Sequence, residues 1–135
     1  MKYALVLESN AETCTDTANI VASMGYLVTP VFSPKKALHA AHMIQFDLIV
    51  TCTATIQGDR RGLTGELARC SPDAILIFVA EAGLDAVHGQ FEGVNGIIKR
   101  PVVAEGLKNA IDAGATRPLL QPLWSTRERR RRAVD

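Results

Sequence analysis

Aromatic residues, glycine-rich motifs and long apolar runs are all scarce in this chain of 135 residues. Aromatic side chains make up only 5% of it, with a single tryptophan. The first apolar run, Tyr3 to Leu7, is too short for a signal peptide or a membrane span. The segment that follows, Glu8-Ser9-Asn10, lacks the glycines of a dinucleotide-binding loop. We therefore expect a cytoplasmic protein that has no membrane segment and needs no cofactor.

Cysteine and histidine are also few and irregularly placed. The chain has three of each: Cys14, Cys52, Cys70, His39, His42 and His88. The cysteines follow neither a metal-binding spacing nor an even-numbered disulfide pattern, which favours a reducing compartment. The histidines form no ligand set with them in the sequence, and no Cys-His-Asp set is visible. We predict that the protein binds no metal and is not an enzyme.

Charge is balanced overall but unevenly distributed. The net charge of +1 combines −3 over residues 1–116 with +4 over residues 117–135, where six of the fifteen basic residues lie. Hydrophobic residues make up 47% of the chain, enough for one core at this length. The sequence therefore predicts a globular domain over residues 1–116. Residues 117–135 are expected to form a basic, partly disordered tail.

Short apolar runs alternate with helix-like segments along the globular part. The expected strands are Tyr3–Leu7, Leu27–Val31, Leu48–Thr51, Ala74–Val79 and Gly96–Ile98. The expected helices run from Ala11 to a stop at Gly25, from Pro34 after a Ser33 cap, over Gly62–Arg69, over the short segment Leu84–Gly89, and from Val103 to a stop at Gly114. Strands without polar alternation are covered on both faces, as in parallel sheets.

This alternation predicts an α/β, flavodoxin-like doubly wound fold with a five-stranded parallel sheet and five helices. The strand order 2-1-3-4-5 is common at this length, and its crevice lies at the carboxyl ends of strands 1 and 3. That order would bring Glu8, Ser9, Cys52 and Thr53 together.

Several residues in this arrangement resemble receiver domains of two-component response regulators. The resemblance covers residues 3–113 and depends on Gly25-Tyr26, Phe46-Asp47-Leu48 and the basic-proline step Arg100-Pro101. It implies a phosphoacceptor aspartate five residues after Asp47, where this chain has Cys52, or Thr51 if the register shifts by one residue. It also implies a tight turn at Pro101 in which the peptide bond is cis.

The other positions that the resemblance implies are altered as well. Glu8 and Ser9 stand where the family has the acidic pair that holds magnesium, and Val79 stands where it has a serine or threonine. Arg100 takes the place of the phosphate-pairing lysine. Phosphoryl transfer needs the acceptor, the metal and the cation together, so these changes imply a pseudo-receiver that is not phosphorylated. We predict that Arg100 instead pairs with Glu8.

A pseudo-receiver would act by protein-protein contact in a bacterial-type two-component pathway. By resemblance, its partner surface is the face of the fourth helix, fifth strand and fifth helix: Leu84–Gly89, Val94–Ile98 and Val102–Ala113. A homodimer is left open.

Two alternatives also remain open. The arginines of the tail would bind nucleic acid or an acidic protein; they are Arg127, Arg129, Arg130, Arg131 and Arg132. Cys52 would be a thiol-based redox sensor if neighbouring cations lowered its pKa, although a small apolar filler is the commoner role for a cysteine at a strand end.

Overall fold

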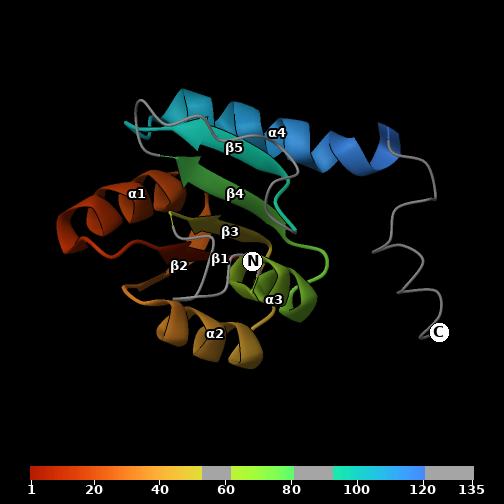
Figure 1. Cartoon of the computed structure of the whole chain (residues 1–135). Helices are drawn as coiled ribbons and strands as arrows, with labels where there is room; N and C mark the ends of the chain where they lie inside the picture. The colour runs from red at the N-terminus through yellow and green to blue at the C-terminus, as the bar shows by residue number, and fades with distance from the viewer. Residues whose placement is uncertain (53–61, 81–92, 121–135) are drawn as a thin grey trace.

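The computed structural model describes residues 1–52, 62–80 and 93–120, and Figure 1 shows the whole chain. The strands are β1 (Lys2–Leu7), β2 (Tyr26–Val31), β3 (Leu48–Thr51), β4 (Ile75–Ala80) and β5 (Gly96–Lys99). The helices are α1 (Ala11–Ser23), α2 (Pro34–Met43), α3 (Gly62–Cys70) and α4 (Ala104–Leu120). In the described residues, no helix is both long and apolar enough to cross a bilayer.

The five strands form one parallel sheet in the order β2-β1-β3-β4-β5. This is the order that the apolar runs predicted, and each strand lies within one or two residues of its expected bounds. The register pairs Leu7 with Thr51 and Ala80 with Lys99. The residues that follow these strands therefore lie along one edge of the sheet, its carboxyl edge.

Side chains from both faces of the sheet are buried, because helices cover both faces. On one face Leu5, Leu7 and Ile49 pack with residues of α2 and α3, which lie side by side in Figure 1. On the other face Val6 and Val50 pack with residues of α1 and α4. Alternate residues of β1 thus enter different clusters, which explains why its buried part, Ala4–Leu7, is apolar without interruption.

Helix ends follow the signals in the sequence. The Asn10 side chain accepts a hydrogen bond from the Thr13 amide and caps α1, and Ser33 does the same for α2 through Lys36. After α1, Gly25 has a φ of +99°, a conformation that glycine adopts without steric cost. The cap at Ser33 and the turn at Gly25 are both as predicted.

One helix prediction is wrong, and another concerns residues that the structure does not describe. The expected stop at Gly114 is wrong, because α4 continues to Leu120 and passes Pro118. Gly114 instead permits close packing: a Cβ there would lie 2.9 Å from Ile75 Cγ2 of β4. The expected helix over Leu84–Gly89 lies outside the described residues, so four of the five expected helices are described.

Candidate functional site

The carboxyl edge of the sheet brings together four of the five residues at the positions that the resemblance implies for phosphorylation. The Cys52 amide donates to the Leu7 carbonyl at 3.1 Å, which places Cys52 beside the end of β1. The Arg100 amide donates to the Ala80 carbonyl at 3.1 Å, which continues the β4–β5 pairing beyond Lys99. Glu8, Cys52, Val79 and Arg100 therefore occupy one edge, although they are far apart in the chain. Ser9, the fifth, is exposed beside them.

Glu8 is the centre of this edge. Its side chain is only 1% exposed, a rare situation for a carboxylate. One oxygen, Oε2, accepts a hydrogen bond of 2.8 Å from the Thr17 hydroxyl of α1. The other, Oε1, forms an ion pair with the Arg100 guanidinium, whose side chain is 21% exposed. The predicted Glu8–Arg100 pair is thus confirmed.

This pairing changes what the edge can bind. A buried carboxylate is tolerated when it is paired and hydrogen-bonded, and both Glu8 oxygens have such partners. Magnesium needs a near-octahedral set of oxygen ligands. The side chains at this edge are poor ligands for magnesium. Glu8 already contacts Thr17 and Arg100, and its neighbours offer only the exposed Ser9 hydroxyl and a thiol.

Cys14 lies beneath this pair, in the core between the sheet and α1. Burial raises the pKa of the Cys14 thiol, and the Glu8 carboxylate raises it further. The thiol also contacts the backbone, with Sγ 3.9 Å from the Val6 carbonyl oxygen and 3.8 Å from that of Val31. Cys14 is therefore protonated at neutral pH and serves as a small core residue.

Cys52 and Val79 both contribute to the packing of the same face. Val79 is 1% exposed and belongs to the cluster beneath α1 and α4, and the half-buried Cys52 packs against that cluster. Val79 has no hydroxyl to donate to an anion in the crevice. The Arg100-Pro101 peptide bond is cis, as the resemblance implied.

Other sequence candidates lie outside the described residues. These are Thr53 of the crevice, the Leu84–Gly89 part of the expected partner surface, and the tail arginines Arg127, Arg129, Arg130, Arg131 and Arg132. Of the expected partner surface, the structure describes β5 and α4, where Val103 is a large exposed apolar side chain just before the helix.

One group of chemically capable residues was missed by the sequence analysis. His42 of α2 lies beside Glu66 and Cys70 of α3, with their ligand atoms within 4.8 Å of one another. The sequence contains part of the signal, because Glu66 and Cys70 are four residues apart and so share a helix face. It does not contain the contact with α2, so the sequence analysis did not anticipate that His42 lies beside these two side chains.

Known proteins resemble this chain in structure far more than in sequence. No family model matches the sequence, and no curated protein matches it either. Three solved structures illustrate the likeness. A response regulator from Burkholderia pseudomallei, described with a phosphorylated aspartic acid, a calcium ion and citrate, has a TM-score of 0.71 at 19% identity. That alignment covers 89% of this chain and 72% of the regulator.

The other two structures are matched over most of their own length. A receiver domain from Clostridium thermocellum has a TM-score of 0.71 at 18% identity, and the alignment covers 89% of this chain and 98% of that domain. A pilus assembly-related protein from B. pseudomallei has a TM-score of 0.66 at 20% identity, with 86% and 90% covered. Together with the strand order and the flanking helices, these similarities show that this chain has the fold of response regulator receiver domains.

Proposed function

We propose that this protein is a pseudo-receiver: a signalling domain of two-component type that is not phosphorylated and acts by protein-protein contact. The observation that carries the proposal is the Glu8–Arg100 ion pair. This ion pair lies at the carboxyl edge of the sheet, where the resemblance puts the metal and the phosphoryl group. A contact between two side chains of the protein thus takes the place of those ligands.

The chemistry of the neighbouring residues supports the same conclusion. An aspartate accepts a phosphoryl group as an acyl phosphate, and the Cys52 thiol cannot form that bond. Transfer also requires a divalent ion and a cation on the phosphoryl oxygens. Here Arg100 is already neutralised by Glu8, so the cation is engaged elsewhere.

A role in protein assemblies fits the similar structures. One of them is described as pilus assembly-related, so the same fold occurs in a protein named for assembly rather than for phosphotransfer. We assign the partner contact to the face of β5 and α4 together with the expected segment Leu84–Gly89. No observation of the described residues favours nucleic-acid binding or redox sensing over this role.

The test is to offer the protein a phosphoryl mimic. Beryllofluoride and Mg²⁺ are added to ¹⁵N-labelled protein, and amide resonances are followed by NMR, with Mg²⁺ alone as the control. We expect no saturable shifts at Glu8, Cys52 or Arg100. Saturable shifts clustered at those residues, dependent on both reagents, would show that the crevice still binds a phosphoryl group and would overturn the proposal.

Partner binding is tested separately. A variant with Val103→Asp, which places a charge on an exposed apolar position beside α4, is compared with the unmodified chain in affinity capture from cell extract. We expect a specific partner to be captured by the unmodified chain and lost by the variant. Equal recovery of every captured protein would rule out this face as the contact.

A further inference from the structure

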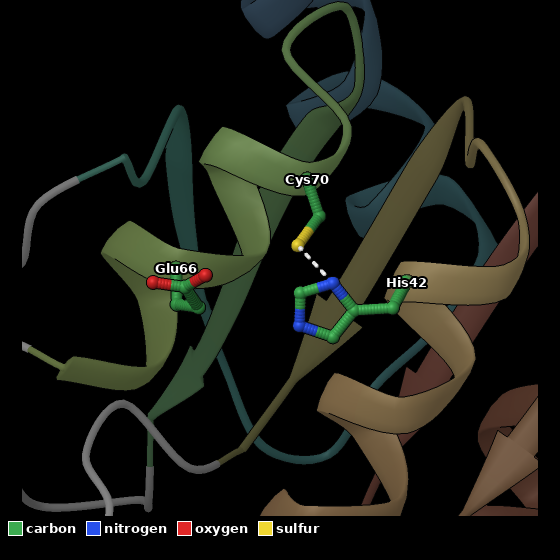
Figure 2. A group of neighbouring side chains, drawn as sticks. All are labelled: His42, Glu66 and Cys70. Carbon is green, nitrogen blue, oxygen red and sulfur yellow. Dashed lines mark hydrogen bonds between the residues drawn. The ribbon is translucent and has the colours of Figure 1, made fainter.

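A second cluster of reactive side chains lies at the other end of the sheet from the Glu8–Arg100 pair. His42 is next to the last residue of α2, and Cys70 is the last residue of α3. Both helices run back from the carboxyl edge, so their ends lie near the starts of β3 and β4. Figure 2 shows the His42 ring and the Cys70 sulfur pointing toward each other, with the Glu66 carboxylate beside them.

The separations match those of a small metal site. The ligand atoms of the three residues all lie within 4.8 Å of one another, and His42 Nδ1 lies 3.6 Å from Cys70 Sγ. In a tetrahedral zinc site, Zn–S is about 2.3 Å and Zn–N about 2.0–2.1 Å. These bond lengths at a tetrahedral angle put the nitrogen and the sulfur about 3.6 Å apart.

The ends of the two helices are held together independently of any metal. The Gln45 side chain donates from Nε2 to the Cys70 carbonyl at 2.9 Å, and the Phe46 amide donates to Ser71 Oγ at 2.9 Å. Ala41 and Leu67 pack in the same buried cluster below them. The backbones that carry His42 and Cys70 are therefore positioned by contacts other than those between the candidate ligands, so little ordering would be needed on binding.

Access and charge also suit an ion. His42 is exposed and the other two side chains are partly buried, so the group opens to solvent. Arg69 forms an ion pair of 2.9 Å with Glu66 Oε1, but its side chain is 51% exposed, and exposed pairs of this kind are weak. An ion can therefore displace the guanidinium from the carboxylate.

The donor set selects the metal. A thiolate, an imidazole and a carboxylate are all ligands that zinc accepts, and hard ions such as magnesium avoid sulfur. When a metal ion binds, it replaces the proton of the Cys70 thiol.

We propose that His42, Glu66 and Cys70 bind one Zn²⁺ ion, with a fourth position open to water or to a group from a partner. The site joins the end of α2 to α3 at the edge of the sheet away from the Glu8–Arg100 pair. It does not depend on whether the protein is a pseudo-receiver.

The experiment uses the full chain, treated with a chelator and kept reduced by a phosphine. Zinc chloride is titrated in competition with a chromophoric zinc chelator, and Co²⁺ is added separately as a spectroscopic probe. We expect one zinc per chain and a near-ultraviolet charge-transfer band from the thiolate to Co²⁺. Cys70→Ser should abolish that band and weaken zinc binding more than about tenfold.

Two further variants keep the outcome decisive. His42→Gln alters an exposed residue and should weaken zinc binding similarly without loss of the fold, monitored by circular dichroism. Cys52→Ser, the matched thiol control at the opposite edge, should leave binding unchanged. Absence of zinc uptake, a Co²⁺ complex without the thiolate band, or an equal loss in Cys52→Ser would each overturn the proposal.

Discussion

Glu8 shows how one buried carboxylate determines which side-chain contacts form at the carboxyl edge of the sheet. A carboxylate that is 1% exposed is tolerated only where a cation and a hydrogen-bond donor contact it, and here Arg100 and Thr17 supply both. The pair therefore compensates the burial of Glu8, which an exposed surface ion pair would not do. Removal of one partner would leave a buried charge without compensation.

The first prediction at this scale concerns Arg100. Arg100→Ala should lower the free energy of unfolding by about 1–3 kcal/mol, because Glu8 would remain buried without its cation. Lys36→Ala, which removes an exposed cation of α2, is the control and should change stability by less than about 0.5 kcal/mol. Urea denaturation measures both. Equal midpoints for the two variants would contradict a stabilising role for the pair.

The second prediction at this scale concerns pH. Burial raises the pKa of Cys14, so in alkali the unfolded chain loses this proton before the folded protein does. The unfolded state then binds fewer protons, and the free energy of unfolding falls as pH rises above about 8.5. Part of this decline comes from Tyr26 and Cys70, whose pKa values burial also raises.

Comparison with Cys14→Ala isolates the contribution of this thiol. Denaturation midpoints are measured between about pH 7.5 and about pH 9.5 for both proteins. The decline should be shallower in the variant, whatever its stability at neutral pH. Identical slopes would mean that Cys14 ionises as easily in the folded protein as in the unfolded chain.

At the scale of the element, α4 shows that glycine can have two different effects within one helix. At Gly114 a Cβ would lie 2.9 Å from Ile75 Cγ2 and 3.4 Å from Asn95 Cβ, so the helix and β4 would have to move apart. At Gly106 the nearest atom to an added Cβ is Val103 Cγ2, at 3.4 Å. Val103 is 54% exposed and can yield.

These contacts predict opposite effects for the same substitution. Gly114→Ala should destabilise the protein, because overpacking costs about 1–3 kcal/mol and exceeds the gain in helix propensity of about 1 kcal/mol. Gly106→Ala should be neutral or stabilising by up to about 1 kcal/mol. Thermal and urea denaturation of the two variants test this. If Gly114→Ala proved as stable as Gly106→Ala, α4 would not pack closely on β4.

At the scale of the whole molecule, we propose that the globular unit ends with α4 at Leu120 rather than near Thr116. Deletion of residues 121–135 should then change the thermal midpoint by no more than about 4 °C, since about 1 kcal/mol shifts the midpoint of a small domain by that much. It should also weaken partner binding if the basic tail is a recognition segment. Failure of the truncated chain to fold would place those residues in the core.

A matched variant distinguishes the effect of the tail's charge on partner binding from the effect of its length. The five arginines at 127 and 129–132 are replaced by glutamine in the full chain. We expect this variant to fold as the full chain does and to bind partners like the truncated chain. Binding that falls steeply with salt, and only in proteins that keep the arginines, would favour a nucleic acid or another polyanion as the partner.

The sequence by itself determined the parallel sheet and most of the helix ends. Continuous apolar strands, the cap at Ser33 and the turn at Gly25 are local signals, so their structures could be predicted from neighbouring residues. The Glu8–Arg100 pair was also predictable, because parallel strand order brings the ends of β1 and β5 to one edge.

Only the tertiary structure decided the features that depend on packing between elements. Gly114 looks like a helix stop in the sequence, and only its approach to Ile75 shows that the space is needed. Thr17 gives no sign in the sequence that it will bind Glu8. His42 and Cys70 are 28 residues apart and meet because α2 and α3 cover the same face. Periodicity places a residue on a face of a helix, but the distance between helices depends on all the side chains that pack between them.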